Sequence, residues 1–421
     1  MSSSSSTTMS SSDGANADAV LTHPFTLGDV HIVGSAHISR ASAIQAEALV
    51  RGIRPRYTAV ELDEDRLRRM IVGERDEQSR VARAEVGVGA GQTLSEVISL
   101  TLRGKITQHV GALTYAAAGA VLGSSPGAEF LAARKAAEQV GSEVICIDRS
   151  ADVTIARVMA AVGQAASVKP SAPPTTSSSS SASGGDQRRR GDDGMLAAME
   201  EAGCAEPNLV VEAAKRVLRA AMQGDEIQPD DLMQMRVCGT KMVESSRVKA
   251  LKSTGGPVAD AFLGLPDMEK EQGRSRDFYS AVFRVIADER DAIMAHRLAQ
   301  LAERAAGEPV VAVVGAAHVN GITRKWQDAC MPEYGESIKP LLAMPSSNAA
   351  PAVTATLAIV TGVMVLARRF PRFIAASSGV ATGGALVGGL IAARGAVQVE
   401  AATRRLVEAS RALPPHADDL V

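Results

Sequence analysis

The sequence predicts an α/β fold: a mainly parallel or mixed sheet flanked by helices, followed by a C-terminal transmembrane helix or hairpin. Short runs rich in Val and Ile, typical of buried strands, alternate with amphipathic helical patterns, and this alternation indicates the α/β class. Two uncharged apolar stretches near the C-terminus predict the membrane segment. With 421 residues, 46% of them hydrophobic, the chain is long enough to bury a sizeable core.

The strands and helices are predicted from apolar periodicity and from capping residues. Ser39 is a suitable N-cap for a helix that runs to Arg54. The other predicted helices are charged or amphipathic and span 126–140, 209–222 and 278–304. The predicted strands span 29–34, 57–62, 143–147 and 309–315.

Changes in composition divide the chain into segments. Residues 1–21 form a Ser/Thr-rich leader without the positive start and apolar core of a secretory signal, and a disordered tail is favoured over a transit peptide. Residues 22–345 form the folded domain. Its Pro-, Ser- and Gly-rich insert at 169–194 cannot bury enough apolar surface to fold. Residues 346–394 hold the membrane segment, and 395–421 form a C-terminal tail.

The membrane segment contains one or two spans. Residues 349–367 are 19 residues without a charge, about the length that crosses a bilayer. Residues 373–393 are 21 further uncharged residues, rich in Gly and Ala at the GxxxG spacing that permits close helix packing. Two spans would form a hairpin with the domain and the tail in the cytosol. The basic connector RRFPR would then face the other side, against the positive-inside tendency, so the second span stays open.

Charge and cysteine content restrict the function classes. The net charge is −2, and no basic stripe with interleaved aromatic residues is present, so we expect no nucleic-acid partner. The four cysteines are far apart in the sequence. They are consistent with a reducing compartment and argue against a disulfide scaffold, so we expect free thiols.

Each predicted strand is followed by polar side chains. In open α/β sheets, ligands bind beyond the carboxyl ends of the strands, so parallel strands would bring these groups to one candidate site. The groups are Ser35 and His37, Glu61 and Asp63, Asp148 and Arg149, and His318.

Two strand ends share one pattern, GSAH at 34–37 and GAAH at 315–318. Glycine allows a tight turn as the chain leaves the strand, and the small residues keep the neighbourhood open. Two neutral histidines and a carboxylate, with one position open for water, form a familiar catalytic metal arrangement. We therefore expect His37 and His318 to bind one ion, with Glu61 as third ligand or as general base. Either histidine alone would also be consistent with a hydrogen-bonded residue at a strand–loop junction.

The predicted helix 278–304 carries charge on its apolar face. At 100° per residue, Glu289 and Arg290 fall within the apolar arc, whereas Asp288 lies outside it. An isolated buried charge is costly, so these residues must be paired or functional. They form either a structural ion pair that holds the helix against the sheet or a site in which Arg290 polarises a carbonyl group.

Five blocks in order along the chain resemble the TraB/PrgY family. They are VHIVGSAHIS, AVELDEDR, PGAEFLAARKAAEQVGSEVICIDR, ADERDAIMAHRL and VVAVVGAAHVNGI, and together they cover about 22–322. The resemblance extends to the Tiki peptidases and the erythromycin-esterase/ChaN-like fold through the paired GxxH motifs and an acidic residue. These map to His37, His318 and Glu61. The family often has Thr where this chain has Ser35, which preserves a hydroxyl group.

The resemblance implies several further properties. Glu289 and Arg290 match an acidic–Arg helix block. Bacterial members are linked to shutting down peptide-pheromone activity, and eukaryotic members include membrane-anchored proteins of mitochondria and the endoplasmic reticulum. We therefore expect an integral membrane protein with a cytosolic domain, at the mitochondrial outer membrane or endoplasmic reticulum, with the plastid envelope as the alternative. Its partners would be the lipid bilayer and either a peptide substrate or organelle-surface proteins.

Two functions from different classes are consistent with these residues. One is a metal-dependent hydrolase, a peptidase by resemblance, that uses a divalent ion of the Zn, Mn or Co class. In it, Glu61 binds the metal or activates water, and Arg290 or Arg149 stabilises the oxyanion. The other is a non-catalytic binding or tethering module on an organelle surface. A haem- or iron-binding role rests on fold analogy alone.

Overall fold

The computed structural model describes residues 24–83, 119, 121–167, 195–252, 280–345 and 401–413. The predicted leader at 1–21, the insert at 169–194 and both predicted spans, 349–367 and 373–393, lie outside these residues. Within the described part, no helix combines the length and the apolar character needed to cross a membrane.

A five-stranded sheet forms the centre of the domain, in the order β1-β2-β5-β3-β4. β2, β5, β3 and β4 are parallel, and β1 is antiparallel to β2. The α/β class and all four predicted strands are confirmed. β1 was not predicted, since three residues are too short to show a periodic pattern. The strands are β1 (Phe25–Leu27), β2 (Val30–Ser35), β3 (Tyr57–Val60), β4 (Glu143–Cys146) and β5 (Val310–Gly315).

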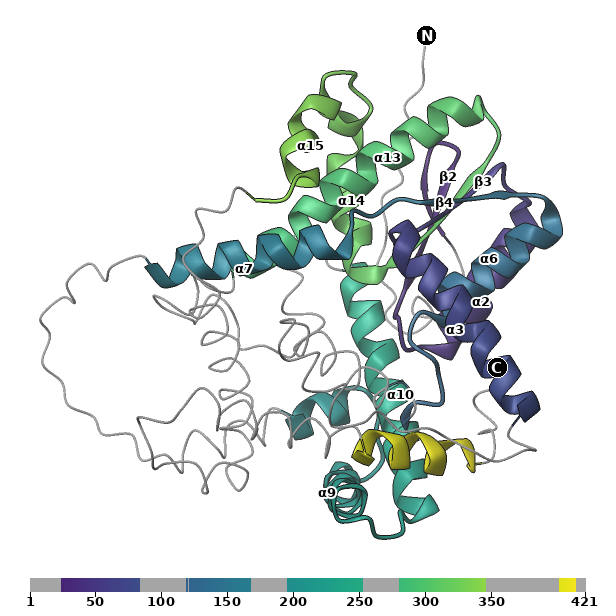
Figure 1. Ribbon diagram of the computed structural model, residues 1–421, viewed down its shortest axis with the longest axis vertical. Helices are drawn as coiled ribbons and strands as arrows, with labels where there is room; N and C mark the ends of the chain where they lie inside the picture. Colours follow the sequence, from purple (N-terminus) through teal and green to yellow (C-terminus); the bar gives the residue numbers. More distant parts are fainter. Residues whose placement is uncertain are drawn as a thin grey trace, which may run out of the picture.

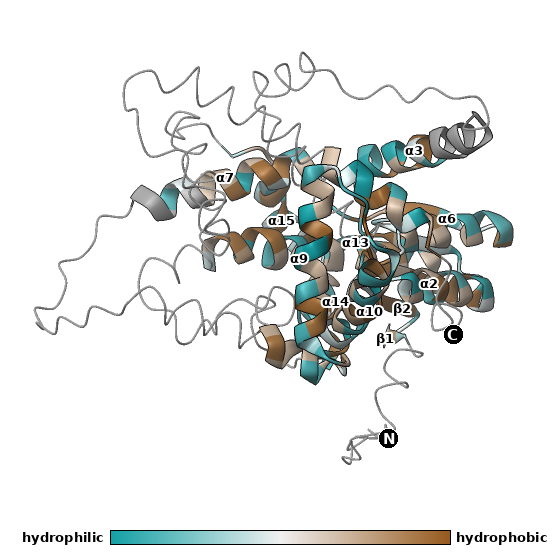
Figure 2. Ribbon diagram, turned by 90° about the horizontal axis from the view of Figure 1, so that it is seen from below, coloured by the Kyte–Doolittle hydropathy of each residue, from teal (hydrophilic) through white to brown (hydrophobic). Residues whose placement is uncertain are grey.

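Helices cover both faces of this sheet (Figure 1). One face packs Val33, Val60 and Val313 against α2 (Arg40–Ile53), α3 (Glu64–Arg83) and α6 (Ala128–Val140). The other face packs Ile32, Ala59 and Ala312 against α10 (Pro229–Lys252), α13 (Glu289–Ala305) and α14 (Ala316–Ala329). Strand residues alternate between the two layers because successive side chains point to opposite faces. Figure 2 shows hydrophilic and hydrophobic residues mixed along the helices, as expected where one side of each is buried.

The predicted helices are confirmed, with one interruption. Ser39 caps α2 by accepting a hydrogen bond from the Ser42 amide at 3.1 Å, and Arg54 ends this helix in the left-handed region. The predicted helix 278–304 is described from residue 280 and contains a π-helical turn, η1 (Arg284–Asp288), before α13. α3, α10 and α14 were not predicted, and in α10 charged and apolar residues are spread around the helix rather than gathered on one face.

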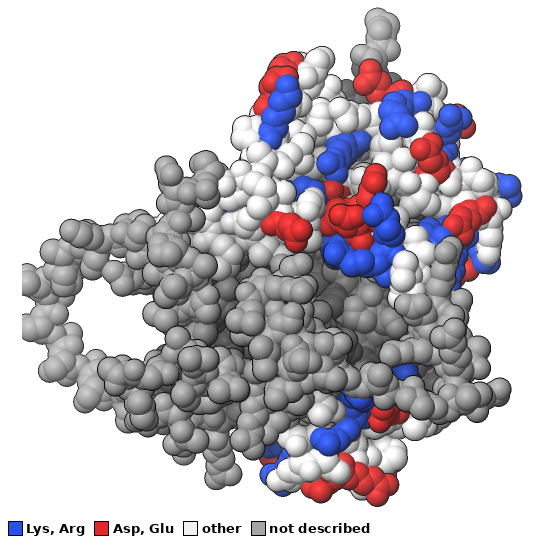
Figure 3. Space-filling view, viewed as in Figure 1, with Lys and Arg blue, Asp and Glu red and all other residues white. Residues whose placement is uncertain are grey.

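Further helices surround the central layers. α7 (Ala151–Ser167) and α15 (Tyr334–Leu342) lie near α13, and α9 (Pro207–Gln223) packs against α10. The C-terminal helix 401–411 returns to the same body and joins an apolar cluster with α9 and α10. Arg236 of α10 secures this contact by donating to the Ser410 carbonyl oxygen at 3.0 Å. Lys/Arg and Asp/Glu side chains are interspersed on the face shown in Figure 3.

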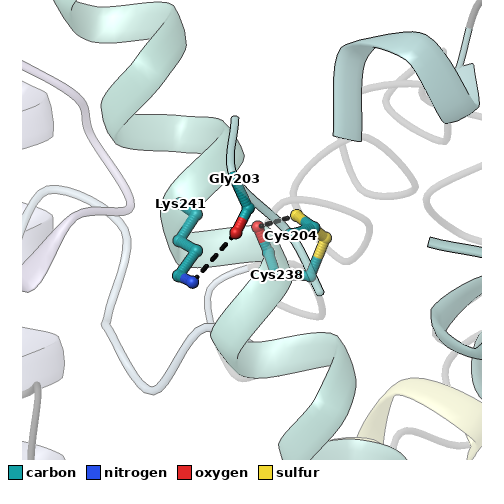
Figure 4. Close-up of a disulfide and its surroundings, with 4 residues drawn as sticks. All are labelled: Gly203, Cys204, Cys238 and Lys241. Atoms are coloured by element: carbon teal, nitrogen blue, oxygen red, sulfur yellow. Dashed lines mark hydrogen bonds between the residues drawn. A yellow bond between two sulfur atoms is a disulfide. The ribbon is translucent and has the colours of Figure 1, made fainter. Parts of the chain in front are cut away.

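Two of the four cysteines form a disulfide. Cys204 and Cys238 are bonded, with their Cα atoms 5.1 Å apart, and only Cys146 and Cys330 are free (Figure 4). The expectation that all four are free thiols is therefore wrong. The pair is 34 residues apart in the sequence, so only the packing of α10 against the segment after helix 195–201 reveals it.

We expect this disulfide to stabilise the α9–α10 region. A bridge that closes a loop of 34 residues contributes about 3–4 kcal/mol in the chain-entropy model, so Cys204→Ser/Cys238→Ser should lower the free energy of unfolding by about that amount. Peptide mapping without reductant should recover the cross-linked pair. Cys330→Ser, at an exposed free thiol, is the control and should leave stability unchanged. Recovery of both residues as free thiols from oxidised protein would contradict the assignment.

Candidate functional site

The carboxyl ends of three adjacent parallel strands bring the predicted site residues together. β5 lies between β2 and β3, and the register sets Ser35 opposite Gly315 and Val60 opposite Val313. His37 follows β2, Glu61 follows β3, and His318 lies in the first turn of α14 after β5. Glu61 therefore follows a strand that lies beside the His318-bearing strand β5 but not beside β2.

Glu61 is the central group of the site. Its side chain is 3% exposed, and its Oε2 accepts a hydrogen bond from the Gly315 amide at 2.5 Å. Its Oε1 accepts from Arg290 and lies 3.2 Å from His318 Nε2 and 4.0 Å from His37 Nε2. The two imidazole nitrogens thus lie within about 7 Å of each other, the sum of those two distances. Two nitrogens that bind one ion lie at most about 4 Å apart, which is twice a metal–nitrogen bond.

Both histidines are oriented by a buried carboxylate on the opposite side of the ring. His37 Nδ1 lies 2.6 Å from Glu129 Oε1, and His318 Nδ1 lies 2.6 Å from Asp291 Oδ1. A carboxylate oxygen accepts the hydrogen bond that an imidazole N–H donates, so both contacts fit the tautomer with the proton on Nδ1. The Nε2 atoms then face the inside of the site. This is the arrangement in which metal-binding histidines are commonly held.

Arg290 reaches the same centre from α13. It donates to Asp148 through Nε and Nη2, with the Nη2–Oδ2 distance at 2.8 Å, and to the Ile286 carbonyl oxygen at 3.1 Å. Its Nη1 lies 3.2 Å from His318 Nε2. The guanidinium group therefore bridges Glu61 and Asp148 at the ends of β3 and β4.

Gly315 is needed for space. A Cβ atom there would lie 3.0 Å from His37 Nε2 and 3.2 Å from Glu61 Oε2. Its φ of −58° and ψ of 138° are accessible to any residue. The expectation of a tight turn is therefore wrong for this glycine, whose missing side chain instead leaves room for His37 and Glu61.

Mutual charge interactions shift the pKa values of the central groups. Burial lowers the pKa of His318, but Glu61 and Asp291 outweigh this effect and raise it to about 10. Burial also lowers the pKa of His37, and Glu129 and Glu61 outweigh it, so that this pKa is raised. Burial raises the pKa of Glu61, yet His318 and Arg290 hold it well below its usual value. Glu61 is therefore a carboxylate and His318 an imidazolium in the metal-free protein at neutral pH.

Glu289 and Arg149 belong to a neighbouring ion-pair cluster. Arg149, with a side chain 1% exposed, donates to Glu289 at 2.7 Å, to the Val285 carbonyl oxygen at 2.8 Å and to the Leu341 carbonyl oxygen at 3.0 Å. Glu289 also accepts two hydrogen bonds from Arg157. These contacts connect α7, η1, α13 and α15. Of the two alternatives that the sequence gave for Glu289, these contacts match the structural ion pair, with Arg149 and Arg157 as its partners.

Two of the carboxylates that support the site were not predicted, and the role of a third, Asp148, was not. Glu129 and Asp291 hold the histidines, and Asp148, noted only as a polar strand end, holds Arg290. A signal for Glu129 exists, since it shares a helical face with the buried Ala133 and Ala136. Asp291 gives no comparable signal, because an acidic residue beside Glu289 and Arg290 resembles an ordinary charged helix.

Comparisons with known proteins identify the domain. Residues 208–328 match the TraB/PrgY/gumN family, so the chain carries a TraB-family domain and the resemblance to this family is confirmed for that segment. The matched segment contains Arg290, Asp291 and His318. The chain is also 30% identical over 131 residues to an uncharacterized protein of Methanocaldococcus jannaschii. That alignment spans 31% of this chain and 30% of the archaeal protein.

We expect Arg149→Met to destabilise the fold without altering ligand binding at Glu61. Removing one partner of a buried ion pair costs about 3–5 kcal/mol, and Arg157, which still pairs with Glu289, should keep the loss at the lower end. Arg51→Met, at the exposed pair with Glu47, is a matched control with a loss below about 1 kcal/mol. Chemical denaturation measures both. A stable Arg149→Met protein with impaired ligand binding would instead favour the oxyanion role.

Proposed function

We propose that this chain, which carries a TraB/PrgY/gumN domain, is a metal-dependent hydrolase of peptide-like substrates that uses His37, His318 and Glu61. One observation carries the proposal. Both Nε2 atoms face the same oxygen of Glu61, while carboxylates hold both Nδ1 atoms. Structural histidines at strand ends do not require this common orientation.

The donor set and the charge balance fit a divalent cation. Glu61, Glu129 and Asp291 contact the two histidines, and Asp148 lies beside Glu61 through Arg290. Arg290 pairs with Glu61 and Asp148, and Arg66 lies 4.0 Å from Asp148. Two imidazoles and a carboxylate are ligands that Zn, Mn and Co accept. Among the described residues, no group of three potential ligands is close enough to hold an ion as it stands. Arg290 contacts Glu61 and His318, the same two residues that would hold the ion.

The protein groups have separate roles in this proposal. A bound ion would polarise a water molecule or a carbonyl oxygen. Glu61 binds the ion or accepts the proton of the attacking water, because its low pKa keeps it ionised. Arg290 stabilises negative charge that develops on the substrate oxygen. His37, whose side chain is 32% exposed, is the most accessible of the three and marks the side from which substrate enters.

Metal binding should be tested directly on the full chain. Wild-type protein should bind one equivalent of Zn²⁺, Mn²⁺ or Co²⁺ by calorimetry, and His37→Ala or His318→Ala should abolish stoichiometric binding. Affinity should fall as the pH is lowered, because the raised pKa of His318 means that a proton must leave Nε2. Glu61→Gln should weaken or preserve binding but remove peptide hydrolysis. His31→Ala on β2, which lies outside the site, is the control for histidine loss.

The binding-module alternative gives a different result in the same experiment. The His37, His318 and Glu61 variants would all keep partner association and cellular localisation. Wild-type protein that binds none of the three ions at pH 8, where competition from protons is weaker, would contradict the hydrolase proposal. In that case the site would remain a buried ion-pair network that holds the sheet ends together.

We further propose that residues 349–367 anchor the protein in a membrane and that 373–393 forms a second span. The sequence supports the anchor through two uncharged stretches of sufficient length. The docking of helix 401–411 against α9 and α10 supports the second span. Because residues 345 and 401 both join the same folded body, the chain between them must cross a membrane an even number of times. The proposed hairpin meets this requirement, and the domain would face the cytosol.

Replacement of 346–400 by a Gly/Ser linker of equal length tests the anchor while keeping helix 401–411. The variant should lose carbonate-resistant membrane association but stay folded. Truncation after Met344 should also lose membrane association but destabilise α9 and α10, since it removes helix 401–411 with Ser410, one of the partners of Arg236. Tags at both termini of the full chain should be digested together by protease added to intact organelles. Digestion of only one tag would contradict two spans. Protection of both would instead place the domain on the oxidising side, where the disulfide is favoured.

A further inference from the structure

We infer that Asp291 and Gly321 form one unit that positions His318, in which the missing side chain of the glycine creates the space that the carboxylate occupies. This inference deepens the proposed function and rests on it, because it assigns residues that orient a proposed metal ligand. Neither residue reaches the centre of the site, so both are positioning residues.

Asp291 is fully enclosed at the contact between α13 and α14. Its Oδ1 lies 2.6 Å from His318 Nδ1, and Asp291 as a whole has no exposed surface. Its Oδ2 is buried and has no hydrogen-bond partner among the described residues. An unsatisfied buried carboxylate oxygen is costly, so its position requires an explanation. No second hydrogen bond fixes the carboxylate, which leaves the surrounding atoms to determine its orientation.

Gly321 supplies the necessary space. It lies three residues after His318 on α14, and residues at this spacing share one face of a helix. A Cβ atom on Gly321 would overlap Oδ2 and Cγ of Asp291 and would come within 3.1 Å of its Cβ. These contacts involve a short side chain that is itself held by His318, so Asp291 cannot move aside while keeping its hydrogen bond. The carboxylate is therefore enclosed between the imidazole and the bare backbone of α14.

The other histidine is held differently. His37 contacts Glu129 and lies beside the Phe130 ring, with 5.3 Å between ring centroids, and it retains solvent exposure. His318 is 7% exposed and is held between two packed helices. The α13–α14 contact thus fixes one ligand of the proposed site rigidly, whereas the other lies at the open side.

The test is a double-mutant cycle of Gly321→Ala and Asp291→Ala in the full chain. Each single variant should weaken Co²⁺ binding by about 10–100-fold, the usual effect of losing an outer partner of a metal ligand. Each should also remove the downfield proton NMR resonance of the His318 Nδ1–H in the metal-free protein. If Gly321 acts by making room for Asp291, the double variant should bind Co²⁺ no more weakly than Asp291→Ala.

Gly52→Ala is the matched control, because Gly52 also lies in a helix and an added Cβ there meets nothing within 4 Å. It should leave Co²⁺ binding and the His318 resonance unchanged.

Additive losses in the double variant would overturn the inference, as would normal Co²⁺ binding by either single variant. If these variants do not fold, the NMR spectra of the wild-type protein and of Asp291→Asn still test the inference. A His318 without Nδ1–H in wild type overturns the inference, and Asp291→Asn should shift the resonance. Wild-type protein that shows this resonance but binds no Co²⁺ would defeat the proposed function and leave this inference standing.

Discussion

The burial of the Glu61 carboxylate is the constraint on which the rest of the site depends. A charge at 3% exposure is costly unless it is paired and hydrogen-bonded. Glu61 meets this requirement with the Gly315 amide, the Arg290 guanidinium and the His318 imidazole. These donors come from the end of β5, from α13 and from α14, so one carboxylate connects the central strand to two helices. Asp148 extends the network to β4 by holding Arg290.

Three consecutive charged residues of α13 each contact a different set of side chains. Glu289 pairs with Arg149 and Arg157, Arg290 pairs with Glu61 and Asp148, and Asp291 holds His318. Successive helical residues point about 100° apart, so one turn can present opposite charges to separate partners. The π-helical turn η1 directly precedes this triplet and supplies two of the carbonyl acceptors, Ile286 for Arg290 and Val285 for Arg149. π-helical turns are frequent at functional sites, and here the turn sits where the charged groups are distributed.

Much of the fold and part of the site could be predicted because local patterns carry them. The Val-rich run of β5 predicted a buried strand, Ser39 predicted a helix start, and both were confirmed. The repeated Gly-x-x-His after two strands indicated that His37 and His318 would converge, since parallel strands end at the same edge of a sheet. The reason for the second glycine was not predicted, because it lies in the position of His37 and Glu61 beside Gly315 and not in a tight turn.

The sequence by itself determined the α/β class, four of the five strands and the convergence of His37, Glu61 and His318, because periodicity and strand-end residues are local properties. Only the tertiary structure decided with which group each charged side chain forms an ion pair or a hydrogen bond. Arg149 and Arg290 look equivalent as candidate oxyanion donors, yet Arg149 is enclosed among backbone carbonyls while Arg290 reaches Glu61. Likewise, the Cys204–Cys238 disulfide and the Asp291–Gly321 contact join residues 30 or more positions apart in the sequence. Such pairings depend on how helices cross and where space remains between them, and no short stretch of sequence contains that information.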